Sequence, residues 1–395
     1  MKVILMNKNT KVLVLEYDSN FKIFSKIIDV VNIDYAPLIL KNIYIKEEKE
    51  EVFLNKLTEW FKGRGIPSWR DKLDLLLERL NIENVCELID KAFGLSLSDQ
   101  YWIKPYDSNV CYDDINFFDH NFDSVDFLDA TFSNDNFTVS NDNSLKTPNN
   151  TTDGMLKKTW VIEDGKRYLL KGGYKNDMLQ PFNEVLASMI CFRLGFDCVK
   201  YEIDIVKNNV VSKCSCITTK DTEIIPAYQI IYGLKKNKSI LDYEKYIEIL
   251  ECNGINNARE KLENMYILDF IIMNEDRHLN NFGIIRDVNT LKWLDVCPIF
   301  DNGQSLNIIS YDSDLVLTEG IGRLFYEVKS FDRIIRLVKD IKRIDISKLD
   351  GVVEDFRCLL KEYQDITKMS DNRINKLCIL LDRQINNLKG IIDKS

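Results

Sequence analysis

A short polar loop follows an apolar run in the stretch DFIIMNEDRHLNNFGII, which spans residues 269–285. The apolar residues before the loop suit a buried helix, and those after it suit one strand of a hairpin. Within the loop, Asp276 and Asn281 lie five positions apart, and Asp301 follows in the turn sequence IFDNG. Carboxylate and amide oxygens are ligands that Mg²⁺ prefers. The chain must therefore fold so that this loop and the Asp-x-Gly turn can form one polar site.

The spacing of Asp276 and Asn281 is that of the Asp and Asn in a kinase catalytic loop. In this interpretation Asp276 accepts or orients the proton of a substrate hydroxyl, while Asn281 and Asp301 hold Mg²⁺. His278 is expected to support the loop by hydrogen bonding, and Arg277 to pair with a nearby carboxylate or phosphate. The alternative is an ordinary polar turn between a helix and a hairpin, which would have no catalytic role.

Two charged residues upstream fit the same chemistry. Lys171 ends the apolar strand sequence RYLLK, and Glu184 lies on the next expected helix. In kinases such a Lys contacts the α- and β-phosphates and pairs with a Glu on the following helix. A surface Lys and a Glu stabilised by a helix dipole would give the same local pattern. The order of this pair and the catalytic loop along the chain favours the catalytic interpretation.

The segment from Thr147 to Gly154, TPNNTTDG, is the candidate loop over the phosphates. It contains only one Gly and matches neither the Walker A pattern nor G-x-G-x-x-G. Its backbone amides could still bind phosphates, as they do in other anion-binding loops. An inter-domain turn is an equally good interpretation of this loop taken alone.

The hydrophobic pattern predicts a β-rich start, then helices, and then a second β-containing region. A hairpin is expected from 2–5 and 11–17. Three helices are then expected: over 52–61, from Ser68 to Leu80 with Ser68 as the cap, and over 84–93. After Pro148 the expected order is β-β-α-β-β. Its elements are strands 158–162 and 167–171, a helix from Asn183 to Leu194 capped by Asn183, and strands 199–206 and 210–218. From about Asp242 the chain is expected to be helical to its end, apart from the catalytic loop and a hairpin of 283–285 with 292–295.

Composition excludes several classes of function. The formal charge of −9 argues against direct nucleic-acid binding. The chain has ten Cys and two His but no C-x-x-C pair, so a zinc site is not expected. We find no signal peptide and no apolar run long enough for a membrane span, and therefore expect a cytoplasmic protein with reduced thiols.

Together, Lys171, Glu184, the motif N-x-D-R-H-x-x-N-x-G at 274–283 and Asp301 resemble the HipA-like serine/threonine kinase family, including the CtkA-type bacterial kinases. Phosphatidylinositol kinases share a related D-R-H-x-x-N element. The upstream loop separates the two groups, because HipA proteins carry S-x-x-G-x-x-x-K. The corresponding residues here are Thr151, Gly154 and Lys158.

The resemblance implies a bilobed, kinase-like α+β fold that uses ATP and Mg²⁺. It implies that ATP is bound by Thr151, Thr152, Gly154, Lys158 and Lys171, and that Thr151 occupies the position of autophosphorylation. The expected parts are an N-terminal accessory domain (1–104), an acidic aromatic linker (105–145), a small lobe (146–235) and a helical lobe (236–395).

The expected function is transfer of the ATP γ-phosphate to a protein hydroxyl. One alternative is a small-molecule or phosphoinositide-type kinase. Another is a nucleotide-binding, toxin-like module regulated by an antitoxin-like partner protein, for which the acidic, aromatic segment 106–145 offers a docking region.

Overall fold

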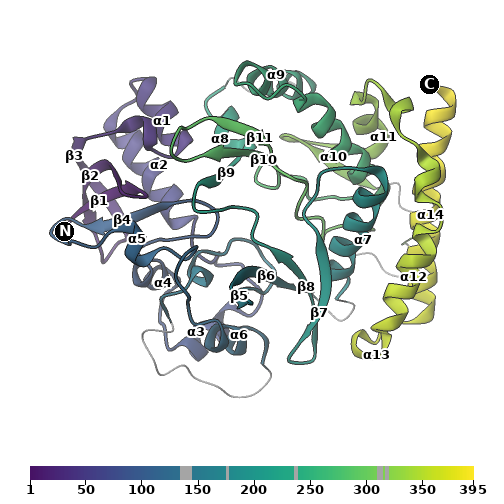
Figure 1. Ribbon diagram of the computed structural model, residues 1–395, viewed down its shortest axis with the longest axis horizontal. Helices are drawn as coiled ribbons and strands as arrows, with labels where there is room; N and C mark the ends of the chain where they lie inside the picture. The colour runs from purple at the N-terminus through teal and green to yellow at the C-terminus, as the bar shows by residue number, and fades with distance from the viewer. Residues whose placement is uncertain (134–144, 175–177, 235–238, 309–314, 316–319) are drawn as a thin grey trace.

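The computed structural model describes residues 1–133, 145–174, 178–234, 239–308, 315 and 320–395. Within these residues the chain has a mixed α+β architecture, in which helices pack around four antiparallel sheets. Figure 1 shows the N-terminal strands at one end of the molecule and the long C-terminal helix at the other. The expected α+β class is confirmed at this level.

The first sheet contains the predicted N-terminal hairpin, in which Asn7 pairs with Thr10 next to the turn. Two more strands extend the hairpin to the order β3-β2-β1-β4. The strands are β1 (Lys2–Asn7), β2 (Thr10–Asp18), β3 (Ile23–Val30) and β4 (Tyr101–Pro105). The short helix η1 (Ile33–Tyr35) follows β3. In β2 the four residues from Val12 to Leu15 are all buried. Leu13, Leu15 and Tyr17 belong to one core cluster with the helices that follow.

Four helices lie between β3 and β4, and their starts show one wrong prediction. They are α1 (Leu38–Ile45), α2 (Glu50–Lys62), α3 (Leu73–Leu80) and α4 (Val85–Lys91). The third helix begins at Leu73 and not after Ser68, and no side chain caps it. The reason is a tertiary contact: the Asp71 amide donates to the Met155 carbonyl at 2.9 Å, and Lys72 has φ 55°. The backbone before α3 therefore contacts the 147–155 loop and does not continue the helix.

The acidic segment after β4 packs against the rest of the chain through its aromatic residues. It contains α5 (Tyr112–Ile115) and α6 (Val125–Phe132). Its buried aromatic side chains include Tyr112, Phe117, Phe122, Phe127 and Phe132. Part of the predicted linker, residues 134–144, lies outside the described residues.

The second four-stranded sheet confirms the expected β-β-α-β-β order. Its strands run in the order β5-β6-β8-β7, and helix α7 packs against β7 and β8. The elements are η3 (Pro148–Thr151), β5 (Lys158–Glu163), β6 (Lys166–Gly172), α7 (Leu179–Leu194), β7 (Tyr201–Val206) and β8 (Asn209–Ser215). Because β6 pairs with both β5 and β8, the end of β6 lies inside the sheet.

The predicted cap of helix α7 is wrong. The helix begins at Leu179, so Asn183 lies inside it with its side chain fully buried. The Asn183 Nδ2 donates to the carbonyls of Gly303 and Ser305, both at 2.9 Å. Asn183 therefore ties α7 to the segment after Asp301, because a buried amide needs hydrogen-bond partners.

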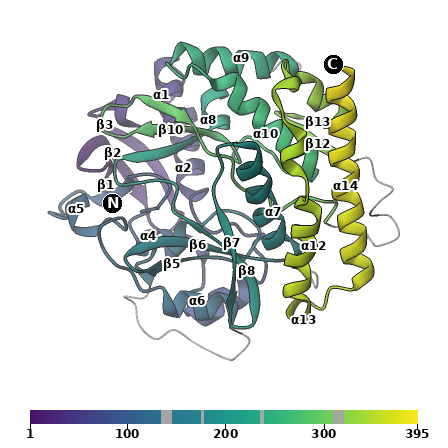
Figure 2. The ribbon, with the colours of Figure 1, turned by 45° about the vertical axis from the view of Figure 1, so that its right-hand side comes forward.

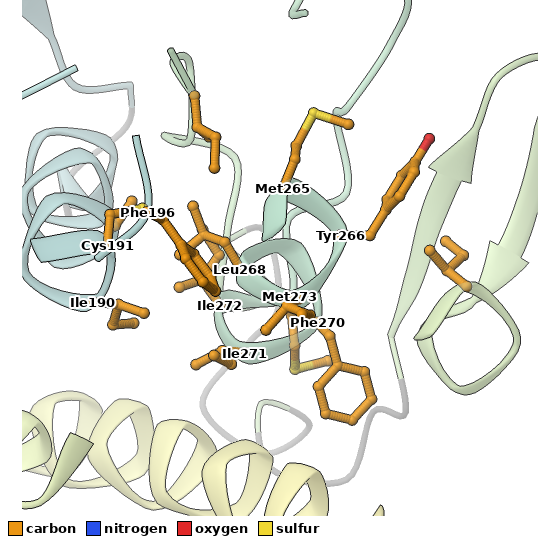
Figure 3. Close-up of a cluster of buried hydrophobic side chains, with 14 of the residues drawn as sticks. Ile190, Cys191, Phe196, Met265, Tyr266, Leu268, Phe270, Ile271, Ile272 and Met273 are labelled. Carbon is orange, nitrogen blue, oxygen red and sulfur yellow. The ribbon is translucent and has the colours of Figure 1, made fainter. Parts of the chain in front are cut away.

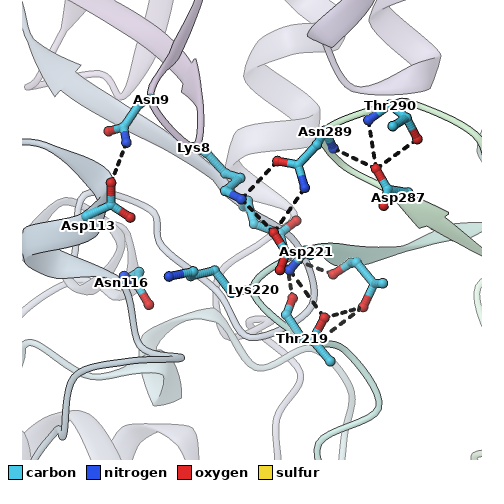
Figure 4. A network of polar contacts seen from close by, with 12 residues as sticks. Lys8, Asn9, Asp113, Asn116, Thr219, Lys220, Asp221, Asp287, Asn289 and Thr290 are labelled. Carbon is cyan, nitrogen blue, oxygen red and sulfur yellow. Dashed lines mark hydrogen bonds and ion pairs between the residues drawn. The ribbon is translucent and has the colours of Figure 1, made fainter.

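A three-stranded sheet of order β11-β10-β9 carries the hairpin that follows the polar loop. Its strands are β9 (Thr222–Pro226), β10 (Gly283–Asp287) and β11 (Trp293–Val296), and the nearby helices are α8 (Ala227–Ile231), α9 (Ser239–Cys252) and α10 (Ala258–Ile272). The first sheet is linked to this region by Lys8, whose ammonium contacts Asp221 at 2.8 Å and Asn289 at 3.0 Å (Figure 4).

The C-terminal region contains a two-stranded sheet that the helical pattern did not predict. It consists of β12 (Ile321–Leu324) and β13 (Glu327–Ser330). The remaining helices are α11 (Phe331–Ile334), η4 (Ile335–Leu337), η5 (Ile341–Arg343), η6 (Ile346–Leu349), α12 (Val352–Glu362), α13 (Gln364–Thr367) and α14 (Asp371–Lys394). Helix α14 is capped at its start by Ser370, whose side chain accepts a hydrogen bond from the Arg373 amide.

The largest core surrounds helix α10, which lies between α7 and α14 (Figure 3). Leu268, Ile271 and Ile272 are fully buried there, and Cys191 and Phe196 pack on the same side. Figure 2 shows α12 and α14 side by side, on the outside of this core. Among the described residues, no helix is both long enough and apolar enough to cross a membrane. The polar loop begins at the end of α10, whose residues from Leu262 to Ile272 are all buried.

Candidate active site

Lys171 lies at the centre of the candidate site, near the end of β6. Its ammonium donates to Glu184 Oε1 at 2.8 Å and to Asp301 Oδ1 at 2.9 Å. It also contacts the Tyr201 hydroxyl at 3.2 Å. The structure thus brings together three residues that the sequence had nominated separately, from a strand, a helix and a distant turn.

The electrostatics of this cluster favour the charged forms of Lys171 and Asp301. Burial alone would lower the pKa of Lys171, but Asp301 and Glu184 hold it well above its usual value. Burial alone would also raise the pKa of the Asp301 carboxyl, but Lys171 and Lys158 hold it well below its usual range. The lysine ammonium and the Asp301 carboxylate are therefore both ionised at neutral pH.

Glu184 connects helix α7 to the turn that carries Asp301. One of its oxygens accepts from Lys171, and the other accepts from the Asn302 amide at 2.8 Å. Asp301 itself has φ 58°, in the left-handed region that Asp adopts more readily than most residues. A left-handed residue held by buried contacts is a frequent feature of functional sites.

The polar loop is held by hydrogen bonds between its side chains and its own backbone. The Asn274 side chain accepts from the Asp276 amide at 3.1 Å, and Asn281 Nδ2 donates to the Asp276 carbonyl at 2.9 Å. The Asp276 carboxylate has His278 Nε2 at 3.8 Å and Arg323 Nε at 3.5 Å. The two loop bonds use the Asp276 main chain, and its side chain is 39% exposed.

Burial raises the pKa of the Asp276 carboxyl above its usual value. The charge of Asp301 raises it further, while His278, Arg323 and Arg277 act in the opposite direction. A raised pKa makes a carboxylate a better proton acceptor. Asp301 is near enough for its charge to act on Asp276.

Arg277 is the residue whose role the sequence defined least. It is 1% exposed and pairs with Asp269 of α10, with Nη2 to Oδ1 at 2.8 Å. The expected carboxylate partner is therefore confirmed. Its guanidinium also donates to the Phe300 carbonyl at 2.6 Å and to the Asn302 side chain at 2.6 Å. Arg277 thus joins the end of α10, the polar loop and the Asp301 turn.

The candidate phosphate loop lies against the N-terminal part of the chain. Thr151 is 8% exposed, and its hydroxyl donates to the Leu95 carbonyl at 2.8 Å. Thr152 contacts Arg70 through its hydroxyl at 3.1 Å. The hydroxyls of both threonines therefore form hydrogen bonds with residues of the N-terminal part.

Gly154 and Lys158 lie close to one another. Gly154 has φ 98°, and a Cβ added there would meet the Lys158 ammonium at 2.6 Å. Burial lowers the pKa of Lys158, which the charge of Asp301 opposes and that of Lys171 reinforces. Lys158 therefore extends the group of charges around Asp301. The candidate phosphate loop and the Lys171 cluster therefore come together at Lys158.

The nominated metal ligands suit a metal that is completed by phosphate oxygens. Among the described residues, no group of three or more His, Cys, Asp or Glu side chains could hold a metal ion. Asn281 and Asp301 supply hard oxygen ligands, and Asn281 uses its Nδ2, not its oxygen, in the loop. Mg²⁺ in phosphoryl-transfer sites commonly takes one or two protein oxygens together with phosphates and waters. The residues present fit that mode of binding.

Comparison with known proteins gives resemblances both in sequence and in fold. No family model matches the chain. Serine/threonine-protein kinase CtkA of Helicobacter pylori strain J99 is 20% identical over 235 residues, which cover 50% of this chain and 70% of that protein. The crystal structure of the H. pylori proinflammatory kinase CtkA is 17% identical, covers 60% of this chain and 92% of its own, and has a TM-score of 0.46.

A second solved structure matches almost the whole chain. The toxin–antitoxin complex of HipA, HipB and operator DNA from Shewanella oneidensis MR-1 is 10% identical to this chain, with a TM-score of 0.52. It covers 99% of this chain and 98% of the matched one. The resemblance to HipA-like kinases that the sequence indicated is therefore confirmed, and the match extends to the fold as a whole.

Proposed function

We propose that this chain is an ATP- and Mg²⁺-dependent serine/threonine protein kinase with a HipA-like bilobed fold. The observation that carries the proposal is the contact of Lys171 with both Glu184 and Asp301, at 2.8 Å and 2.9 Å. These residues lie 13 and 130 positions from Lys171 in the sequence. A structural ion pair would not require a second carboxylate on the same ammonium, beside a loop that carries Asp276.

The proposed division into parts follows the sequence. Residues 146–235 form the small lobe with Lys171 and Glu184, and residues 236–395 form the helical lobe with the polar loop. Residues 1–104 and 105–145 are the accessory domain and the linker. Under this division ATP binds between the β5–β8 sheet and the segment that follows α10.

Each residue of the site has a proposed role. Lys171, held in place by Glu184, contacts the ATP phosphates, and Asp276 orients the substrate hydroxyl and accepts its proton. Asn281 and Asp301 hold Mg²⁺, which neutralises charge that develops on the phosphates during transfer. His278 supports the loop beside Asp276. The loop from Thr151 to Lys158 covers the phosphates.

Incubation of the purified protein with radiolabelled ATP and Mg²⁺ tests this function. We expect label on the chain itself or on a generic protein substrate, and none when Mg²⁺ is chelated. Label that appears on phosphoinositide vesicles and not on protein would favour the lipid-kinase alternative. Absence of transfer to every acceptor would contradict the proposal.

The match to HipA bears on partners. That structure contains HipB and operator DNA together with HipA. We propose that this chain also has a regulatory protein partner, and that it does not itself bind DNA, because its formal charge is −9. Copurification from the native host followed by mass spectrometry tests for such a partner.

Asp301→Asn is expected to lower transfer by about 10²-fold, because it removes a charge that acts on the metal and the phosphates. It should also change the response to acid. The folded-state pKa of Asp301 is depressed, so its contribution to stability is present above its unfolded value, about 3.9, and is lost as the pH falls below it.

Urea unfolding of both proteins between pH 3 and 7 measures this linkage. The difference in free energy of unfolding between wild type and Asp301→Asn should be constant above about pH 5 and should shrink below about pH 4. A difference that does not depend on pH would contradict the ion pair with Lys171.

Phosphorylation of Thr151 is expected to weaken ATP binding. The buried hydroxyl donates to the Leu95 carbonyl, and a phosphate would add a charge of about −1.5 to −2 beside an acceptor. The loop must then leave its position. Mass spectrometry of the protein, combined with ATP titration, checks this. Fully phosphorylated protein that binds ATP as tightly as Thr151→Val would refute the prediction.

A further inference from the structure

Arg70 belongs to the N-terminal part of the chain and contacts the candidate phosphate loop. It lies in the sequence GIPSWRDKL, between α2 and α3, and is 5% exposed. Its Nε donates to the Gly154 carbonyl at 2.9 Å, and its Nη1 donates to the Thr152 hydroxyl at 3.1 Å. Its Nη2 donates to the Thr152 carbonyl. All three contacts are to the loop, which is 82 or more positions away in the sequence.

The charge of Arg70 has no acidic partner in direct contact. Among the residues that the structure describes, no carboxylate forms an ion pair with it. Burial lowers the pKa of the guanidinium to about 10, although the charge of Asp153 opposes this, so Arg70 is still charged at neutral pH. A buried cation that has only neutral acceptors is costly to maintain. Its position is explained if the anionic phosphates of a nucleotide lie near the same loop.

Further contacts hold this loop to the N-terminal part, among them the Asn150 side chain, whose Nδ2 donates to the Leu88 carbonyl at 2.8 Å. The Asp71 amide donates to the Met155 carbonyl at 2.9 Å, directly beside Arg70. The Thr151 hydroxyl donates to the Leu95 carbonyl at 2.8 Å. The loop is thus attached on both sides of Gly154, whose φ of 98° is a conformation that side chains other than glycine rarely adopt. The loop would lose much of this support without residues 70–95.

We propose that Arg70 is a positioning residue for ATP: it holds the backbone from Thr152 to Gly154 in the conformation that binds phosphates. The N-terminal part of the chain thereby sets the affinity for nucleotide without contributing to the transfer step. This inference rests on the proposed kinase function for its ligand, but the attachment of the loop can be measured without ATP.

The test compares Arg70→Gln with Arg64→Gln in the full-length protein. Arg64 is a matched control because its side chain is also nearly buried, at 7% exposed, and it also donates to backbone carbonyls, those of Gly94 and Tyr101. It pairs with Asp99, and among the residues that the structure describes it makes no hydrogen bond or ion pair with the loop. Both variants lose a largely buried guanidinium, but only Arg70→Gln removes hydrogen bonds made directly to the loop.

Hydrogen exchange of peptides covering 147–156, without nucleotide, gives the first readout. We expect Arg70→Gln to speed exchange there at least about 10-fold, which is a change of 1.4 kcal/mol in local opening. Arg64→Gln should leave exchange in these peptides unchanged. Unchanged exchange in Arg70→Gln, or equal acceleration in both variants, would overturn the inference whether or not the protein is a kinase.

Steady-state kinetics give the second readout. Arg70→Gln should raise KM for ATP about 10-fold with kcat within about 2-fold of wild type, as expected for a lost binding contribution. The KM of Arg70→Lys for ATP should lie between those of wild type and Arg70→Gln. An ammonium can replace one donor of the guanidinium but not its planar set of donors. A fall in kcat with an unchanged KM would overturn the positioning role, even if the loop exchanges faster.

Discussion

Replacing Asp276 with Asn is expected to lower phosphoryl transfer by about 10³-fold, the effect of losing a positioned proton acceptor. The substitution keeps the size of the side chain. It also leaves the loop intact, because the loop bonds to Asn274 and Asn281 use the Asp276 backbone. Binding of ATP should change little, since Lys171 and Asp301 remain. A rate assay with a protein substrate and a separate ATP titration measure the two effects.

Asp295→Asn provides the control for this prediction. Asp295 is on β11, close in sequence to the site, and its carboxylate pairs with Lys261 at 2.5 Å on a partly exposed surface. Surface pairs of this kind contribute about 0–1 kcal/mol, so the variant should fold and transfer phosphate normally. If Asp276→Asn keeps more than about a tenth of the wild-type rate, Asp276 is not the residue that handles the substrate proton.

Replacing Arg277 with Met is expected to destabilise the fold by about 3–5 kcal/mol, because it leaves the buried Asp269 carboxylate without its partner. Both side chains are nearly inaccessible, at 1% and 3% exposed. The variant also loses the donors to Phe300 and Asn302. Activity should fall with stability, because these contacts place the Asp301 turn. Denaturant unfolding measures the loss.

Two comparisons separate a specific effect of Arg277 from the loss of any arginine. Arg259→Met removes an arginine that pairs with Glu244 at the surface, at 27% and 44% exposed, and should cost less than about 1 kcal/mol. Asp269→Leu combined with Arg277→Met should recover part of the lost stability, since no charge is then left unpaired. Equal losses in the two arginine variants would contradict the role given to the buried pair.

Local patterns were sufficient to predict several elements. The alternation of residues predicted the first hairpin, and apolar periodicity with turn residues predicted the β-β-α-β-β order and the β10–β11 hairpin. These signals act between neighbouring residues, so they can be read without knowledge of the packing. The spacing of Asp276 and Asn281 is likewise a local property, because both residues lie in one loop.

Other features depended on partners far along the chain. The start of α3 is set by the contact of Asp71 with Met155, and the buried position of Asn183 by carbonyls after Asp301. The strands β12 (IGRL) and β13 (EVKS) are only four residues each, too short for an apolar–polar alternation in the sequence to indicate them. In each case a tertiary contact outweighed the local preference, which amounts to less than about 1 kcal/mol per residue.

The sequence by itself determined which chemical groups are available: a lysine at a strand end, a glutamate on the next helix, and an Asp–Asn loop followed by an Asp-x-Gly turn. Only the tertiary structure decided that Lys171 contacts both Glu184 and Asp301, and that Arg70 holds the loop around Gly154. Motif spacing is fixed by the covalent chain. The meeting of residues that are 84 or 130 positions apart is fixed by the burial of the whole core.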